Sequence, residues 1–137
     1  MAIRLFAVGM PVVLLNLILI KPMGSTGVWI AFLLGEMLNK ISLCIEEMAG
    51  NVVQHAFKPG EKKWFDVLVL DKPESVVIRM RDNGAAFNPL HYLNTADEPD
   101  KEARFDIKMI SSLADQFDYS RNMGLNVLVI VLDKQKI

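Results

Sequence analysis

The chain has 137 residues, a net charge of −1 and one cysteine, Cys44. This length corresponds to about one domain and is sufficient for a single hydrophobic core, because a domain of about 150 residues buries about 70% of the surface of its unfolded chain. The net charge near zero does not indicate a nucleic-acid partner, and we expect none. A single cysteine excludes an intramolecular disulfide and fits a small core residue in a reducing cytoplasm.

The charges are unevenly distributed, and residues 1–38 form a chemically distinct, apolar part of the chain. The charged side chains in this part are Arg4, Lys21 and Glu36. Leu5–Ile20 carries no charge, and an 18-residue helix that ends at Ile20 would be about 27 Å long, just short of a hydrocarbon core of about 30 Å. We therefore divide the chain into two parts, residues 1–38 and residues 39–137.

Three interpretations of the apolar part are open. It could be a signal peptide with Arg4 as its basic flank, although no clear small-residue cleavage site follows. It could also be a buried helix of a soluble protein. We favour a membrane-embedded helical hairpin that turns at Lys21–Gly27 and whose second arm, Val28–Leu38, continues into the next helix. Gly27–Leu38 and the preceding Pro11–Pro22 resemble the last helices of multidrug-and-toxin-extrusion transporters.

Hydrophobic periodicity predicts both helices and strands in residues 39–137. Apolar residues at three- and four-residue spacing indicate helices, and alternating or continuous apolar runs between turn signals indicate strands. The expected elements are, in chain order, a helix Asn39–Phe57, strands Trp64–Leu70 and Ser75–Arg81, a polar stretch Asn88–Lys101, a helix Ala103–Phe117, a short extended piece Tyr119–Ser120, a turn Asn122–Gly124 and a strand Asn126–Leu132. Helices on one face of a mostly antiparallel sheet define an α+β two-layer sandwich.

A first polar cluster lies on the helix Asn39–Phe57. Glu47, Asn51 and His55 recur at four-residue spacing and therefore share one face of this helix. Mg²⁺ prefers hard oxygen ligands and keeps several waters, so the side-chain oxygen of Asn51 can supply one ligand beside nucleotide phosphates. The carboxylate of Glu47, one turn away, is placed to accept a proton from an attacking hydroxyl or water. By itself, such a pair is more typical of a solvated helix face.

A second polar cluster, Asp82–Phe87, follows the strand Ser75–Arg81. An Asp at the end of a buried strand can accept a hydrogen bond from an exocyclic amine such as that of adenine. Gly84 lets the backbone turn or approach a ligand closely, and Phe87 can form a wall of the pocket. By itself, Asp-Asn-Gly is a turn signal. Together with the first cluster, it predicts a site for a nucleotide and its metal ion, and so phosphoryl transfer.

The two clusters together resemble the paired motifs of the GHKL ATPases, and more closely those of the anti-sigma-factor serine/threonine kinases. Ile45–Phe57, which ends in His-Ala-Phe, resembles the Asn-box helix of these kinases, and Arg81–Pro89 resembles their adenine box. Ile107–Leu132 resembles their closing helix and strand. The resemblance covers about residues 39–134. It implies a Bergerat-type fold that here lacks its first strand and helix, with ATP and Mg²⁺ as ligands.

The resemblance also implies a role for each matching residue. Glu47 would be the general base, Asn51 the Mg²⁺ ligand and Asp82 the residue that recognises adenine. Gly84 and Phe87 would shape the pocket.

The segment Ala103–Ile107 differs from the family pattern, because Arg104 and Asp106 stand where the family has glycines. Asp106 would bring a negative charge near the triphosphate, and at about 4 Å two like charges cost on the order of 1–4 kcal/mol in water-like surroundings. Arg104 could offset this charge, and we include it among the nucleotide-binding residues.

The leading hypothesis is an ATP-binding serine/threonine kinase module, attached to a membrane through residues 1–38, that phosphorylates an anti-anti-sigma-like antagonist. A sigma factor is a second candidate partner, and a homodimer is left open. The alternatives are a non-catalytic partner-binding module and a truncated fragment of a transporter–ATPase fusion, either of which has lost effective ATP binding. The intact Glu47, Asn51 and Asp82 favour the first hypothesis, whereas the altered Ala103–Ile107 favours the others.

Overall fold

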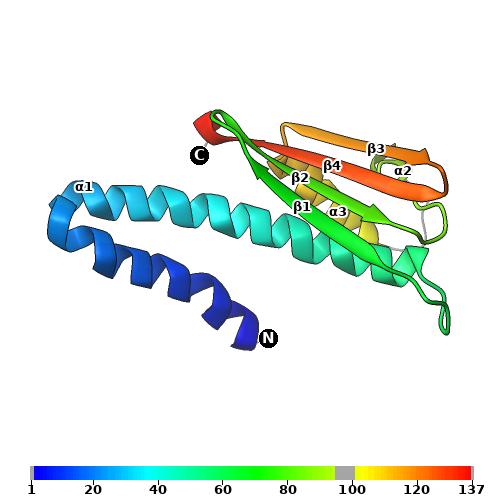
Figure 1. The fold of residues 1–137 in the computed structure, drawn as a ribbon, viewed down its shortest axis with the longest axis horizontal. Coiled ribbons are helices and arrows are strands. Elements are labelled where there is room, and N and C mark those ends of the chain that lie inside the picture. The colour runs from blue at the N-terminus through cyan, green and yellow to red at the C-terminus, as the bar shows by residue number, and fades with distance from the viewer. Residues whose placement is uncertain (1, 95–100, 137) are drawn as a thin grey trace. The chain divides into compact units, whose positions relative to one another are not determined.

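The computed structural model describes residues 2–94 and 101–136. The described residues divide into two compact units, one up to Ser42 and one from Leu43 to Lys136. The elements are α1 (Ala2–Asn51), η1 (Val52–Ala56), β1 (Phe65–Asp71), β2 (Ser75–Asp82), α2 (His91–Asn94), α3 (Lys101–Leu113), β3 (Gln116–Asn122), β4 (Leu125–Asp133) and η2 (Lys134–Lys136) (Figure 1). The short elements η1 and η2 are a π-helix and a 3₁₀-helix.

The apolar unit is a helix that bends sharply at one glycine. Gly24 has φ 56° and ψ −135°, which are not helical, and the two arms of α1 turn back on each other there (Figure 1). This confirms the predicted break within Lys21–Gly27 and the continuation of the second arm into the next helix. By length and composition, one helix in the described part could cross a membrane. It is Gly24–Ala56, with a mean hydropathy of 1.6 in its most apolar 18 residues, and the core helix of a soluble protein passes the same test.

The second unit contains one antiparallel sheet in the order β1-β2-β4-β3. Burial alternates strictly along the two central strands, because successive side chains of a strand point to opposite faces. Val76, Ile78 and Met80 of β2 are buried on one face, and Val77 and Arg79 are half-buried on the other. The sheet therefore has one covered face and one open face, as the sequence predicted, and the α+β class is confirmed.

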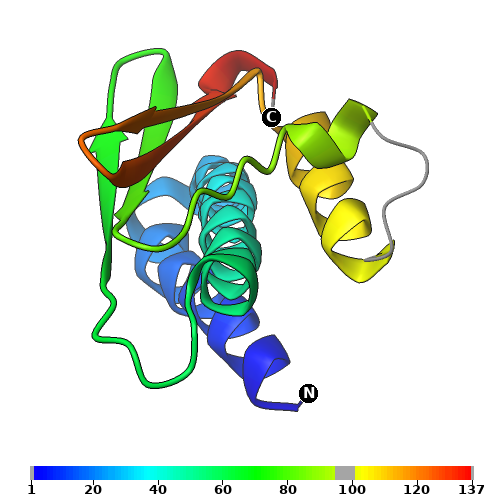
Figure 2. The same cartoon turned by 90° about the vertical axis from the view of Figure 1, so that its right-hand side faces the viewer.

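The helical layer covers the first of these faces with the last turns of α1, with η1 and with α3 (Figure 2). The apolar stripe predicted for Asn39–Phe57 appears as a row of buried residues at four-residue spacing, namely Cys44, Met48, Val52 and Ala56. The other buried apolar residues of this core are Ile107 and Ile110 of α3 and the inward-facing residues of β2 and β4. Each fully buried Ile or Met side chain stabilises the core by about 1.5–3 kcal/mol.

The predicted elements were wrong at two places. The helix predicted over Ala103–Phe117 ends at Leu113, and Phe117 belongs to β3, which extends from Gln116 to Asn122 rather than over Tyr119–Ser120 alone. The reason is the tertiary pairing of β3 with β4. The sequence of β3 does not predict this pairing, because it contains only two large apolar residues. The polar stretch Asn88–Lys101 contains the short helix α2, and its residues 95–100 lie outside the described residues.

Candidate functional site

Asn51 is the last residue of α1 and is 3% exposed. Its Nδ2 donates a hydrogen bond to the backbone carbonyl of Glu47 at 3.0 Å, which fixes the rotation of the amide and leaves Oδ1 as an acceptor. The chain then widens into the π-helix η1, and single π-turns of this kind are frequent at functional sites. Asn51 therefore presents a buried, oriented amide at the end of a core helix.

Asp82 is the last residue of β2 and is also 3% exposed. Its Oδ1 accepts two hydrogen bonds of 2.8 Å, from the backbone N–H of Gly84 and from Nδ2 of Asn126. Both bonds go to the same oxygen, so Oδ2 retains its lone pairs for another donor. Burial of a carboxylate costs free energy unless it is hydrogen-bonded, and these two hydrogen bonds offset part of that cost for Asp82.

Asn126 of β4 holds Asp82 in place, and the remaining hydrogen-bonding groups of its side-chain amide also have partners. Its Nδ2 also donates to the backbone carbonyl of Ala85 at 2.8 Å. Its Oδ1 accepts from the Tyr119 hydroxyl at 2.7 Å and from the Arg121 guanidinium at 2.6 Å. The amide thus uses both donors and both lone pairs, so it positions Asp82 rather than contacting a ligand.

Gly84 is buried because its backbone packs directly against the end of η1. A Cβ at this position would lie 2.5 Å from the carbonyl oxygen of Ala56 and 2.7 Å from its Cβ. The next residue, Ala85, donates its backbone N–H to the same carbonyl at 2.8 Å. Gly84 has no positive φ, and its close contact in this structure is with Ala56 of η1, the π-helix that directly follows Asn51.

Asn51, Asp82 and Asn126 line one cavity of about 10 Å³, together with Met48, Val52, Phe87, Pro89, Tyr119 and Leu128. Phe87 also stacks on His55, with ring centroids 4.9 Å apart and planes inclined by 12°. A space of about 10 Å³ holds about one water molecule. This space is smaller than a nucleobase.

The structure thus brings three of the predicted site residues, Asn51, Asp82 and Phe87, to the same cavity. Glu47 lies one turn before Asn51, half-buried, and is not among the residues that line this cavity. Arg104 lies in α3, and its side chain is outside the described residues.

Sequence reasoning missed the supporting residues Asn126, Tyr119 and Arg121. The available signal was Asn126, the one strongly polar side chain in the strand Asn-Val-Leu-Val-Ile-Val-Leu. Its significance depends on β2, which lies beside that strand in the sheet but is distant from it in the sequence.

An antiparallel sheet with helices on one face, in which a helix-borne Asn and a strand-end Asp share a cavity, defines a nucleotide-binding domain. The chain belongs to the family of histidine kinase-like ATPase domains, whose model matches residues 29–132, more than half of the chain. The match begins within the apolar part, ten residues before Asn39. Membership supports an ATP-binding module of the kinase type in residues 29–132.

Individual relatives match over shorter lengths. Serine/threonine-protein kinase BtrW of Bordetella bronchiseptica is 33% identical over 54 residues, which are 39% of this chain and 38% of BtrW. The histidine kinase domain of the blue-light activated histidine kinase EL346 from Erythrobacter litoralis superposes with a TM-score of 0.55 at 15% identity, over 74% of this chain and 46% of that chain. A longer chain of EL346 gives a TM-score of 0.56 at 15% identity, over 74% of this chain and 32% of that chain. The chain thus spans less than half the length of each, and the structural similarity shows the fold.

Proposed function

We propose that this protein is an ATP-dependent serine/threonine kinase module of the anti-sigma-factor type. The observation that carries the proposal is the placement of Asp82 and Asn51 in one cavity. Asp82 has one oxygen occupied by two donors and the other available to an adenine amine. Asn51 has its amide nitrogen committed to Glu47 and its oxygen available to a cation. The resemblance to anti-sigma kinases and the partial match to BtrW support the serine/threonine specificity.

The chemistry would be transfer of the γ-phosphoryl group of ATP to a hydroxyl. Oxygen donors such as Asn51 Oδ1 suit Mg²⁺, which when bound would neutralise charge on the phosphates. The target hydroxyl oxygen would form a bond to the γ-phosphorus, its proton would pass to the carboxylate of Glu47, and ADP would leave. Gly84 would keep the segment Asp82–Phe87 against η1, and Phe87 and Arg104 would contact the nucleotide.

The partners and location in this proposal follow from the resemblance. The substrate would be an anti-anti-sigma-like antagonist, and a sigma factor would be a second partner. Residues 39–137 would lie in the cytoplasm, and residues 1–38 would attach them to the membrane as the transporter-like hairpin. The apolar helix Gly24–Ala56 supports this attachment by its length and composition.

The small cavity favours a second candidate function. A space for about one water molecule, lined by Phe87 and Pro89, suits a partner-binding module that has kept the fold but lost effective ATP binding. In this case the buried polar network of Asp82 and Asn126 would be structural only.

Calorimetric titration of the full chain with Mg-ATP distinguishes these functions. Asp82→Asn and Asn51→Ala should each weaken binding at least about tenfold, because a hydrogen bond to a charged group contributes about 1.5–3 kcal/mol. Asp118→Asn is the matched control, because Asp118 is an exposed acid of β3 outside the cavity. Equal binding by wild type and Asp82→Asn at millimolar nucleotide would refute the ATP site. Absence of Mg-ATP binding by wild type would support the second function, whereas tight binding without phosphotransfer to any candidate antagonist would keep the ATP site and refute the kinase activity.

A further inference from the structure

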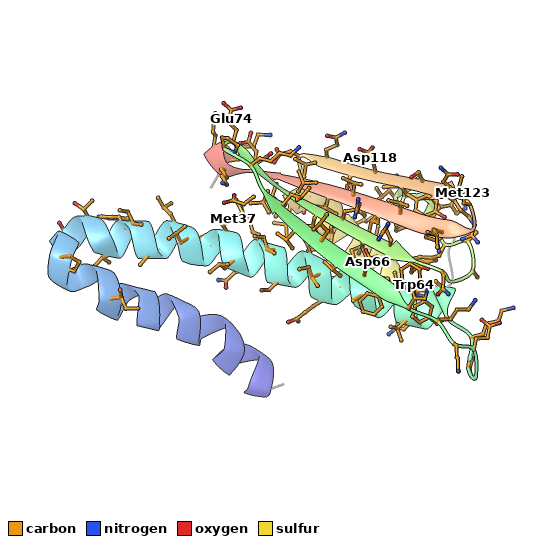
Figure 3. The ribbon with its side chains drawn as sticks, in the orientation of Figure 1. Met37, Trp64, Asp66, Glu74, Asp118 and Met123 are labelled. Atoms are coloured by element: carbon orange, nitrogen blue, oxygen red, sulfur yellow. The ribbon has the colours of Figure 1, made fainter. Side chains whose placement is uncertain are left out.

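Arg121, near the end of β3, joins two parts of the candidate nucleotide site. Its Nη1 donates to the side-chain oxygen Oδ1 of Asn126 at 2.6 Å and to the backbone carbonyl of Gly84 at 3.3 Å. Arg121 lies two residues before Met123, which Figure 3 labels at the end of the sheet that also carries Trp64. Because Arg121 is exposed, a substitution there removes these two hydrogen bonds without leaving a cavity in the core.

The groups around Asn126 determine which way its amide points. Its Oδ1 accepts from the Arg121 guanidinium and the Tyr119 hydroxyl, and its Nδ2 donates to Asp82 and to the carbonyl of Ala85. A hydroxyl both donates and accepts hydrogen bonds, whereas a guanidinium only donates. Of the two groups that face Oδ1, Arg121 is therefore the one that requires an oxygen there. This requirement keeps Nδ2 of Asn126 directed toward Asp82.

The carboxylate oxygens of Asp82 that remain available decide which base it can recognise. Oδ1 already accepts from Asn126 and from the backbone of Gly84, which uses both of its lone pairs and leaves Oδ2 for a ligand. A single acceptor oxygen suits adenine, whose edge presents one exocyclic amine beside a ring nitrogen that accepts. Guanine presents two adjacent donors, N1–H and its exocyclic amine, and a carboxylate binds two parallel N–H groups with both oxygens. The bond from Asn126 to Oδ1 therefore favours adenine over guanine.

We propose that Arg121 is a positioning residue that sets the preference of this site for ATP over GTP. Arg121 orients the amide of Asn126, this amide occupies Oδ1 of Asp82, and Oδ2 accepts from the adenine amine. The inference rests on the proposed ATP site and adds to it a residue that acts through Asn126 rather than on the nucleotide. Loss of Arg121 would let the amide of Asn126 turn, which would release Oδ1 to pair with guanine.

Calorimetric titration of the full chain with Mg-ATP and with Mg-GTP tests this role through the ratio of the two affinities. Arg121→Met should lower the preference for ATP by about fivefold, because one hydrogen bond contributes about 1 kcal/mol net. The lost positive charge does not alter this ratio, since both nucleotides carry the same triphosphate. Arg121→Lys keeps a group that only donates and should restore most of the preference. Lys72→Met, at an exposed cation between β1 and β2, is the matched control and should leave the ratio unchanged.

Nuclear magnetic resonance of the full chain in mild detergent follows Asn126 directly, without any nucleotide. The side-chain amide protons of Asn126 should be protected from exchange with water in wild type and in Arg121→Lys, because both of them are hydrogen-bonded. They should exchange several-fold faster in Arg121→Met, in which the amide is free to turn. Equal exchange rates in wild type and Arg121→Met would show that Arg121 does not orient Asn126.

The titrations separate failure of this inference from failure of the proposed function. A wild type that binds neither nucleotide would refute the ATP site and the inference with it. A wild type that binds ATP would leave the ATP site intact, and the inference would then be overturned by an unchanged ratio in Arg121→Met. Equal weakening of ATP and GTP by Arg121→Met would likewise show a structural role only, without an effect on base preference.

Discussion

Gly84→Ala should destabilise the protein although it adds a single methyl group. The new Cβ would lie 2.5 Å from the carbonyl oxygen of Ala56, and ordinary van der Waals contact begins at 3.4 Å. The segment Asp82–Phe87 and the end of η1 must therefore separate by about 0.9 Å. Both atoms of this contact belong to the backbone or to Cβ, so no flexible side chain can absorb the shift. The hydrogen bond from Ala85 to Ala56, now 2.8 Å, would be stretched as well.

The expected loss of stability is about 2–4 kcal/mol. Overpacking of a tight contact costs about 1–3 kcal/mol, and the weakened backbone bond adds about 1 kcal/mol. Urea unfolding followed by circular dichroism measures this loss, and the midpoint should fall by about 1–2 M for a slope of about 2 kcal/mol/M. Because Gly84 also donates to Asp82, nucleotide affinity should decrease in the same variant.

Gly50→Ala is the matched control for this prediction. Gly50 lies in α1, is exposed, and would place its Cβ in open space with nothing within 4 Å. Alanine in a helix is more stable than glycine by about 0.5–1 kcal/mol, so this variant should be more stable than wild type. If Gly84→Ala and Gly50→Ala have the same unfolding midpoint, the steric explanation for Gly84 is wrong.

Three further predictions concern the sheet. Asn126→Leu should lower the free energy of unfolding by about 2–4 kcal/mol, since it leaves buried partners of Asn126, Asp82 among them, unsatisfied; a change below about 0.5 kcal/mol in urea unfolding would contradict this. The hydrogen bond from Arg81 lowers the pKa of Asp66 from its usual 3.8. The ion pair therefore stabilises the folded state above pH 3.8, and this stabilisation is lost as the pH falls through the lowered pKa. The melting temperatures of wild type and Asp66→Asn should therefore differ at pH 7 and converge in acid, and a constant difference would exclude the ion pair as its cause. Met123 adopts φ 49° in the turn before Gly124, where Asn is favoured, so Met123→Asn should raise the melting temperature.

Local patterns in the sequence were sufficient for most of the second unit. The alternation in Ser75–Arg81 predicted a strand with one buried face, and the spacing of Cys44, Met48, Val52 and Ala56 predicted the buried face of the helix. These patterns are reliable because burial of one face requires a fixed period, about 3.6 residues for a helix and 2 for a strand. The resemblance of Ile45–Phe57 and Arg81–Pro89 to kinase motifs led to the family that the comparisons support.

The sequence by itself determined the fold class, the break near Gly24 and the two polar clusters, because each depends on residues close together in the chain. Only the tertiary structure decided that Asn51 and Asp82 line one small cavity, since these residues come from a helix and a strand that meet by packing. The tertiary structure also decided the roles of Asn126 and Gly84. One completes a hydrogen-bond network across three strands, and the other fits against Ala56 because it has no Cβ. Contacts of this kind join residues that are distant in sequence, so local periodicity cannot predict them.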